Sequence, residues 1–315
     1  MVAFFHLGGV QRARLGTTSR RKGKAVTTRT TFLAPVLSLA LTGAVALVAT
    51  KAVHAQMQQA QREGEARRLE ITLEAIGELS TLKQTDPELV SIRDNFIEDI
   101  HHSGSLTDEN RALISIVALA TQQAFPQLKQ ITHQALELGV SPLVVRESVY
   151  LAAAFIGFPK TENAIAAVNG VLAQRNISLP LVEAGTVHQD ARYDKGLSLQ
   201  APIYGNEMKD AMKGLPENLG EDIPRFLTEL LFGDFYTRKG LDLKTRELLV
   251  LSILATLGAE KQIRAHAIGN LKAGNDKATL IAAMVQCLPY IGFPYMFNAI
   301  NTIRSVEWPD QQSGE

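Results

Sequence analysis

The chain has 315 residues, 46% of them hydrophobic and 20% charged, a composition typical of a soluble globular protein and a length that suggests about two domains. Its formal net charge is zero, but residues 1–55 hold eight Lys and Arg and no acidic residue, so the remainder has eight more acidic than basic side chains. An acidic body argues against nucleic-acid binding, because phosphate contacts need a basic footprint. The single cysteine, Cys287, excludes an internal disulfide, a two-cysteine redox centre and a cysteine-rich zinc site.

The N-terminal segment, residues 1–55, has the pattern of a secretory signal. A basic cluster at 20–24 precedes an uncharged, mostly apolar run at 30–50, and the small residues of Val53-His54-Ala55 follow. This pattern predicts a signal peptide that is cleaved near residue 55. The alternative is an uncleaved membrane anchor, because a run of about 20 apolar residues is long enough to span a bilayer. In both cases we expect the body outside the cytoplasm, in a bacterial periplasm, either free or anchored to the inner membrane.

The body is predicted to be helical throughout, since no stretch alternates with period two for long enough to form a strand. A lead-in helix is expected at about 87–101, followed by a first helical module to residue 175 in which Ser141 is an N-cap and Pro142 the first helical residue. Residues 176–220, rich in Pro and Gly, are predicted to be a connector.

A second lead-in helix at about 221–236 opens a second module that extends to residue 305. Asp242 is a plausible N-cap for a helix that ends at Gly258, and a further helix should run from Glu260 to about 273. Asp276 should cap a third, apolar helix, which is expected to end near Pro289 because proline removes a backbone donor. Gly292-Phe293-Pro294 is expected to form the turn into a last helix through Phe297 and Ile300.

The two modules are copies of one another. Residues 156–165 (IGFPKTENAI) and 291–300 (IGFPYMFNAI) are 135 positions apart and agree at seven of ten positions. The same offset relates Leu106 to Leu241, Arg111 to Arg246 and Gly139 to Gly274. A register kept over some sixty residues without insertion indicates a tandem duplication.

Glu247 and His266 are the residues best placed for chemistry. They lie 11 residues before and 8 residues after the turn glycine Gly258, so on two antiparallel helices they are nearly level, about 16 and 12 Å from the turn. A carboxylate facing an imidazole can act as a general acid–base pair. From the spacing alone, the alternative of a surface glutamate and a histidine satisfied within the helix interface stays open.

The whole pattern of the second copy resembles the carboxymuconolactone decarboxylase family, which includes the alkylhydroperoxidase D-like proteins. The resemblance is carried by Phe232-Gly233-Asp234, residues 241–248 (LDLKTREL), His266, Gly274 and Gly292-Phe293-Pro294 with Asn298-Ala299. It covers 221–304 well and 87–170 more weakly. It implies an all-helical fold, assembly as a trimer or hexamer, and roles for Glu247 and His266 as catalytic residues.

The resemblance also implies limits on the chemistry. In the peroxidase branch the glutamate and histidine serve a Cys-x-x-Cys pair, whose positions hold Ala259 and Gln262 here, so thiol peroxidase activity is not expected. The first copy has Ala112 and Ile131 where the second has Glu247 and His266, and we interpret it as degenerate and structural.

A further glutamate, Glu147, lies where family members often carry one in the third helix. We expect it to be exposed; the alternative is that the copies pack face to face and Glu147 completes a site with His266.

These observations predict acid–base chemistry, without metal or cofactor, on a small organic acid or lactone: a decarboxylation or a related lyase or hydrolase step. The alternative is a non-catalytic binding or assembly protein of the same fold. The expected partners are a small-molecule substrate and further copies of the chain, most simply in a homotrimer, with a possible membrane contact through the N-terminal segment and no nucleic acid.

Overall fold

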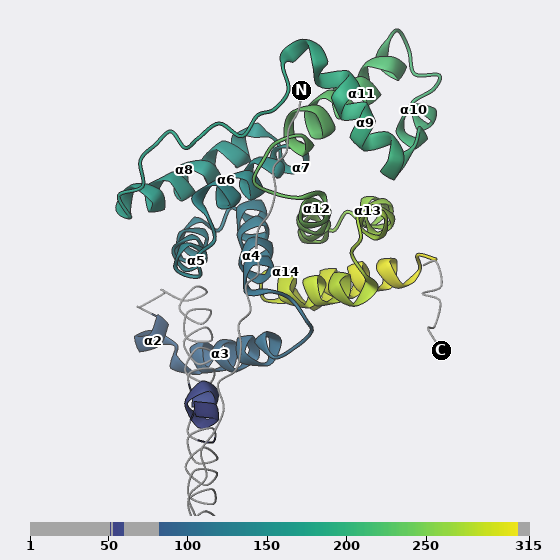
Figure 1. The fold of residues 1–315 in the computed structure, drawn as a ribbon. Coiled ribbons are helices and arrows are strands. Elements are labelled where there is room, and N and C mark those ends of the chain that lie inside the picture. The colour runs from purple at the N-terminus through teal and green to yellow at the C-terminus, as the bar shows by residue number, and fades with distance from the viewer. Residues whose placement is uncertain (1–50, 52, 60–81, 308–315) are drawn as a thin grey trace, which may run out of the picture. The chain divides into compact units, whose positions relative to one another are not determined.

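The computed structural model describes residue 51, residues 53–59 and residues 82–307 (Figure 1). Residues 1–60 and residues 61–315 form two separate units. The predicted signal segment lies mostly outside the described residues; within it, Lys51 and residues 53–55 are helical. Over residues 82–307 every regular element is a helix and no strand is present, which confirms the predicted all-α fold of two helical modules.

The first copy is built from a lead-in helix and five further helices. Ser141 begins its third helix as predicted, because its hydroxyl accepts a hydrogen bond from the Val144 amide at 3.2 Å and Pro142 follows at the first helical position. A four-residue helix, α2 (Leu82–Thr85), precedes these elements. The helices of the copy are α3 (Pro87–His101), α4 (Asp108–Gln122), α5 (Phe125–Glu137), α6 (Pro142–Leu151), α7 (Ala153–Ile156) and α8 (Phe158–Gln174).

The second copy repeats this order. The predicted N-caps are confirmed: the Asp242 and Asp276 carboxylates each accept a backbone N–H bond at 2.7 Å, and Gly258 ends the first helix in the left-handed conformation. Its elements are α11 (Leu219–Leu227), the π-helix η2 (Thr228–Tyr236), α12 (Leu243–Leu257), α13 (Glu260–Lys272) and α14 (Lys277–Arg304).

The predicted turn after the third helix is confirmed. The helix passes through Pro289 and ends at Gly292, whose φ of 73° and ψ of 168° are non-helical, so α14 consists of two helices joined at this kink. One missing backbone donor is tolerated here because the residues around Pro289 are held in the core, among them Leu288 and Ile291. The same backbone break occurs in the first copy at Gly157, with φ 80° and ψ 161°.

The two copies share one hydrophobic core. Helix α4 of the first copy packs against both α12 and α14 of the second, and α6 packs against α12 and η2. Buried side chains such as Leu113 and Leu251 belong to the same cluster. Among the described helices, α14 alone is long and apolar enough to cross a membrane, but half of that apolar stretch is buried inside this core, as expected of a core helix.

The predicted connector contains three ordered helices: η1 (Gln189–Ala191), α9 (Arg192–Tyr204) and α10 (Glu207–Ala211). Helix α9 packs closely along η2 and also contacts α13; Figure 1 shows this group of helices beside α13. The close approach depends on two facing glycines, since a Cβ on Gly196 would lie 2.3 Å from the Thr228 carbonyl oxygen and one on Gly233 would lie 2.5 Å from that of Arg192. The connector therefore adds a structural layer to the second copy.

Candidate active site

Glu247 is fully buried in the first turns of α12, with 0% of its surface exposed. A buried carboxylate is costly unless several donors reach it, so its partners define the site. His266 on the neighbouring helix α13 is 9% exposed, and its Nδ1 lies 3.1 Å from Glu247 Oε2. The predicted contact between these two residues is confirmed, and the equal heights estimated from the turn at Gly258 were correct.

Two tyrosines that the sequence analysis did not single out complete the coordination of Glu247. The Tyr204 hydroxyl, at the end of α9, donates to Oε2 at 2.7 Å, and the Tyr236 hydroxyl, at the end of η2, donates to Oε1 at 2.8 Å. Burial raises the pKa of Tyr204 and of Tyr236 well above the usual value, and the neighbouring Glu247 charge adds to the effect. Both tyrosines are therefore protonated donors, and the Glu247 carboxylate accepts a hydrogen bond from each of them.

This network fixes the position of the proton on His266. The Tyr204 oxygen lies 2.7 Å from His266 Nδ1, but its single proton is donated to Glu247, so it accepts from Nδ1. Nδ1 also lies 3.1 Å from Oε2 of Glu247. Because this oxygen accepts hydrogen bonds, the contact again requires the proton to be on Nδ1. In the neutral imidazole the lone pair is consequently on Nε2, which has no hydrogen-bond partner among the described residues.

A glycine makes room for this arrangement. Gly269 follows His266 by three residues on α13, and a Cβ at that position would lie 2.3 Å from the Tyr204 hydroxyl and 2.9 Å from Glu247 Oε2. In the first copy the equivalent position holds Gln134, a large side chain that is almost fully buried. The space that Tyr204 and Glu247 need in the second copy is thus available only with glycine at 269.

His266 and Tyr204 line a pocket of about 190 Å³. Most of its surface is apolar. The apolar lining residues are Phe155, Met208, Leu227, Leu231, Phe232 and Ala265. The polar ones, besides His266 and Tyr204, are Gln200, Glu207 and Gln262. Because Nδ1 is engaged on the buried side of the ring, Nε2 is the atom that His266 can offer to a molecule in this pocket.

The first copy contributes to the pocket of the second. Phe155 of α7 packs edge-on against the His266 ring, with centroids 6.0 Å apart and an interplanar angle of 76°. The residue equivalent to Phe155 in the second copy is Tyr290, whose hydroxyl donates to Ser115 of α4 in the first copy at 2.8 Å. Phe155 of the first copy therefore lines the pocket of the second, and the equivalent Tyr290 of the second copy lines the pocket of the first.

The equivalent pocket of the first copy is smaller and lacks the counterparts of Glu247 and His266. Its volume is about 40 Å³, Ala112 and Ile131 occupy those two positions, and the titratable side chains in its lining are His101, Asp108 and Arg111 together with Tyr290. Arg111, the counterpart of Arg246, donates to Gln286 Oε1 at 2.9 Å and to the carbonyl oxygens of Ser103 and Gly104. This arrangement supports the interpretation of the first copy as structural.

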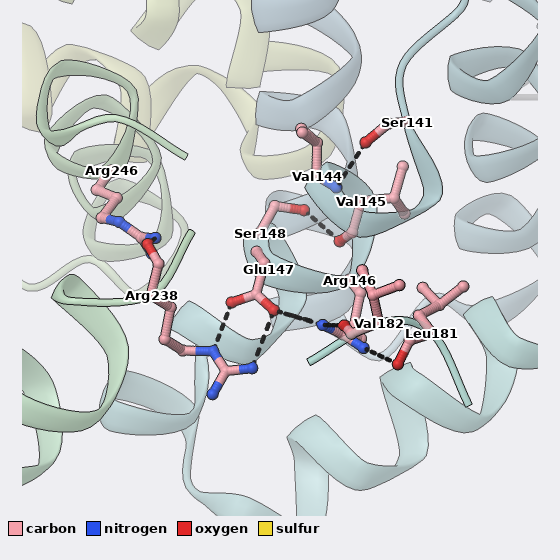
Figure 2. Close-up of polar contacts among 10 residues, drawn as sticks. All are labelled: Ser141, Val144, Val145, Arg146, Glu147, Ser148, Leu181, Val182, Arg238 and Arg246. Carbon is pink, nitrogen blue, oxygen red and sulfur yellow. Dashed lines mark hydrogen bonds and ion pairs between the residues drawn. The ribbon is translucent and has the colours of Figure 1, made fainter. Parts of the chain in front are cut away.

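Glu147 differs from the expectation of an exposed residue, because it is only 1% exposed. The Arg238 guanidinium, from the second copy, donates to its two oxygens at 2.7 and 3.1 Å, and Arg146 donates to Oε1 at 3.0 Å (Figure 2). The copies pack face to face, as the alternative required, but Glu147 pairs with these arginines. It forms an ion cluster with these arginines between the copies and is not hydrogen-bonded to His266.

The positions relevant to thiol peroxidase chemistry hold no reactive cysteine. Ala259 occupies the N-cap position of α13, Gln262 lines the pocket, and Cys287 is fully buried in α14. Burial raises the pKa of the Cys287 thiol to about 12, so it is protonated and inaccessible at neutral pH.

The fold and the site together define a class: an all-helical protein with two tandem copies and one carboxylate–imidazole pair at a small pocket. The model of the carboxymuconolactone decarboxylase family matches residues 87–170 and 221–304, which is more than half of the chain. The chain belongs to this family.

Two relatives are consistent with this. One is the 4-carboxymuconolactone decarboxylase of Acinetobacter baylyi, 25% identical over 108 residues, which are 34% of this chain and 81% of that protein. The other, from Paracoccus denitrificans, is named "Uncharacterized 15.0 kDa protein in nqo9-nqo10 intergenic region" and is 35% identical over 92 residues, 29% of this chain and 69% of that protein.

Proposed function

We propose that the chain catalyses proton transfer on a small organic molecule in the pocket of the second copy, with His266 Nε2 as the group that takes and returns the proton. One observation carries this proposal: Nδ1 is committed to Glu247 and Tyr204, so the lone pair of the neutral ring is on the nitrogen available to the pocket. Proton transfer by a positioned imidazole is a common element of catalysis at neutral pH.

Each residue of the site has a defined part in the proposed step. Nε2 takes a proton from a carbon or a water, and the imidazolium that forms is stabilised by the Glu247 carboxylate on its other edge. Tyr204 and Tyr236 hold that carboxylate in place by hydrogen bonds. The same imidazolium returns the proton to the product, so the cycle closes with neither metal nor cofactor.

The name of the relative from Acinetobacter baylyi supports a lactone as the substrate and decarboxylation as one form of the reaction. In that reaction carbon dioxide leaves, its electrons enter the unsaturated lactone carbonyl, and a proton is delivered to carbon. The signal-like N-terminal segment supports placing the activity outside the cytoplasm, so the natural substrate need not be that of a cytoplasmic enzyme.

A second candidate function, ligand binding without turnover, is favoured by one observation. The Tyr204 hydroxyl lines the pocket, but its proton is used on Glu247, so the only other acid–base side chain in the described lining is Glu207, at the exposed start of α10. A reaction that needs a second, buried acid or base beside His266 would not be supported.

The test is turnover of two lactones by the full chain: 4-carboxymuconolactone, followed by loss of carbon dioxide, and α-angelica lactone, followed by migration of its double bond in deuterated water. Turnover of either that is lost in His266→Gln and kept in Glu260→Gln, an exposed site on the same helix, supports the proposal. Absence of turnover, or turnover that survives His266→Gln, contradicts it and leaves ligand binding as the function.

A further inference from the structure

Two buried asparagines join the helices that carry Glu247 and His266. We infer that Asn270 on α13, held by Asn275, is a positioning residue that fixes the geometry of this pair for proton transfer. The inference rests on the proposed function in one respect, namely that His266 is the group that transfers the proton. Neither asparagine is among the residues that line the pocket, so both act through the pair.

The Asn270 amide nitrogen contacts the backbone at both residues of the pair. Its N–H groups donate to the Glu247 carbonyl oxygen on α12 at 2.9 Å and to the His266 carbonyl oxygen on α13 at 2.8 Å. One rigid amide group thus connects the two backbone positions from which the carboxylate and the imidazole extend. Because the contact between Glu247 and His266 depends on the separation of these positions, the amide limits how far the pair can part.

Asn275 fixes the orientation of that amide. Its own N–H groups donate to the Asn270 side-chain oxygen at 2.7 Å and to the Lys244 carbonyl oxygen, in the first turns of α12, at 2.9 Å. Carbonyl oxygens only accept hydrogen bonds, so the Asn270 amide must direct its nitrogen at the two backbone carbonyls and its oxygen at Asn275. Asn270 and Asn275 are 0% and 3% exposed, so these contacts are shielded from water.

The first copy shows that the fold does not need these two amides. The equivalent positions hold Ala135 and Val140, both of which are buried and apolar. The backbone closes in the same way in both copies, because the Val140 N–H donates to the Ala135 carbonyl oxygen at 2.9 Å, as the Asn275 N–H does to that of Asn270. Helix α4 also packs on α5 as α12 packs on α13. The side-chain amides are therefore dispensable for the turn and for the packing of the two helices.

The amides occur in the copy that has the acid–base pair. The first copy, which has apolar residues in their place, also has Ala112 and Ile131 in place of the pair. Burial of an amide costs free energy that its hydrogen bonds must offset, and the first copy shows that an apolar solution is available at the same positions. A purely structural role gives no reason for asparagine at both positions, whereas a fixed separation of Glu247 and His266 does.

The test places the residues of the first copy in the second. Asn270→Ala combined with Asn275→Val removes both amides together, and the urea unfolding midpoint should change little because both partners become apolar. In long-range ¹⁵N–¹H spectra of the full chain, His266 should pass from a ring protonated on Nδ1 to a mixture of both tautomers, since its contacts with Glu247 loosen. Turnover of 4-carboxymuconolactone or α-angelica lactone should show a kcat lower by roughly tenfold to a hundredfold, with KM much less affected.

Two further variants separate positioning from stability. Asn270→Ser keeps a donor for the His266 carbonyl oxygen within α13 but is too short to reach that of Glu247, so it should give the same mixture of tautomers, even if the double variant does not fold. Leu172→Ala opens a cavity in the core at α8 of the first copy. It should lower the urea midpoint and leave both the tautomer and kcat unchanged.

A His266 ring that keeps its proton on Nδ1 in Asn270→Ser would overturn the inference, and so would a kcat in the double variant equal to that of the unmodified chain. A mixture of tautomers in Leu172→Ala would also overturn it, because any loss of stability would then have the same effect. The tautomer is measured without a substrate. If neither lactone is turned over, the proposed function fails, while the tautomers of the variants still decide whether Asn270 positions the pair.

Discussion

Replacement of Glu247 by glutamine should reverse the proton position on His266. The amide keeps one acceptor oxygen but presents N–H groups where the second oxygen was. One arrangement gives both tyrosine hydroxyls and the imidazole Nδ1 a partner: the amide oxygen accepts from Tyr236, one amide N–H donates to the Tyr204 oxygen, and the Tyr204 hydroxyl donates to His266 Nδ1 across the existing 2.7 Å. His266 then carries its proton on Nε2 and loses the lone pair that faces the pocket.

The size of the effect follows from the competing arrangement. If Nδ1 kept its proton, the amide would have to turn its N–H toward Tyr236, whose buried hydroxyl proton would lose its acceptor. An unsatisfied buried donor costs about 1–3 kcal/mol, so the reversed tautomer should be favoured by roughly 5- to 150-fold. The substitution also changes the stability of the fold. Three charge-assisted hydrogen bonds become weaker neutral ones, which is unfavourable, while the removal of a buried charge is favourable. The net loss in unfolding free energy should be about 2 kcal/mol.

The assay is long-range ¹⁵N–¹H correlation NMR of the histidine rings, with His266 assigned by its absence in His266→Gln. Glu260→Gln, an exposed change on α13, is the control and should leave the His266 tautomer as it is. Urea unfolding of the same variants gives the stability change. A His266 ring that still carries its proton on Nδ1 in Glu247→Gln would refute the proton assignment on which the proposed function depends.

Three further predictions concern the alkaline range, the cysteine and assembly. Because burial raises the pKa of Tyr236 only in the folded chain, stability should fall above about pH 10 by up to about 1.4 kcal/mol per pH unit for this group, and Tyr236→Phe should remove that share in urea titrations. Cys287 should not react with iodoacetamide in the folded chain, and hydroperoxide turnover that Cys287→Ala abolishes would contradict the argument. Residues 56–315 should sediment as a trimer that serine substitutions at the exposed Phe293 and Phe297 weaken, whereas a single monomeric species at micromolar concentration rules the trimer out.

The helices and the central pair could be predicted because they depend on local signals and on a short turn. Asp242 and Gly258 define the ends of α12, and counting from the turn brings Glu247 level with His266. The duplication allowed each helix boundary to be checked twice, because a helix start or end in one copy predicts the same boundary at the equivalent residue of the other copy. The end predicted near Pro289 lies three residues before the observed break at Gly292, because tertiary packing keeps the helix intact through the proline.

The tyrosines could not be predicted because their contacts depend on the tertiary path of the chain. Tyr204 is 43 residues from Glu247 and lies in a segment whose prolines and glycines indicate a linker. The signal for its role is indirect: Gly196 and Gly233 permit the close packing of α9 on η2, and Gly269 leaves room for the hydroxyl. Such a signal has meaning only once the facing helix is known.

The reciprocal insertion of Phe155 and Tyr290 has a consequence for how the two copies can change. In an assembly of identical single modules, any substitution that alters a pocket also alters the wall of its neighbour. Here the residue that covers His266 and the residue at the equivalent place in the first copy are encoded separately, so one can be phenylalanine and the other tyrosine. The ion pair of Glu147 and Arg238 adds the opposite constraint, because it joins a fully buried carboxylate of the first copy to an arginine of the second. Substitutions can therefore remove the acid–base residues of the first copy. The first copy must still be retained as a domain, because it supplies part of the pocket wall of the second copy.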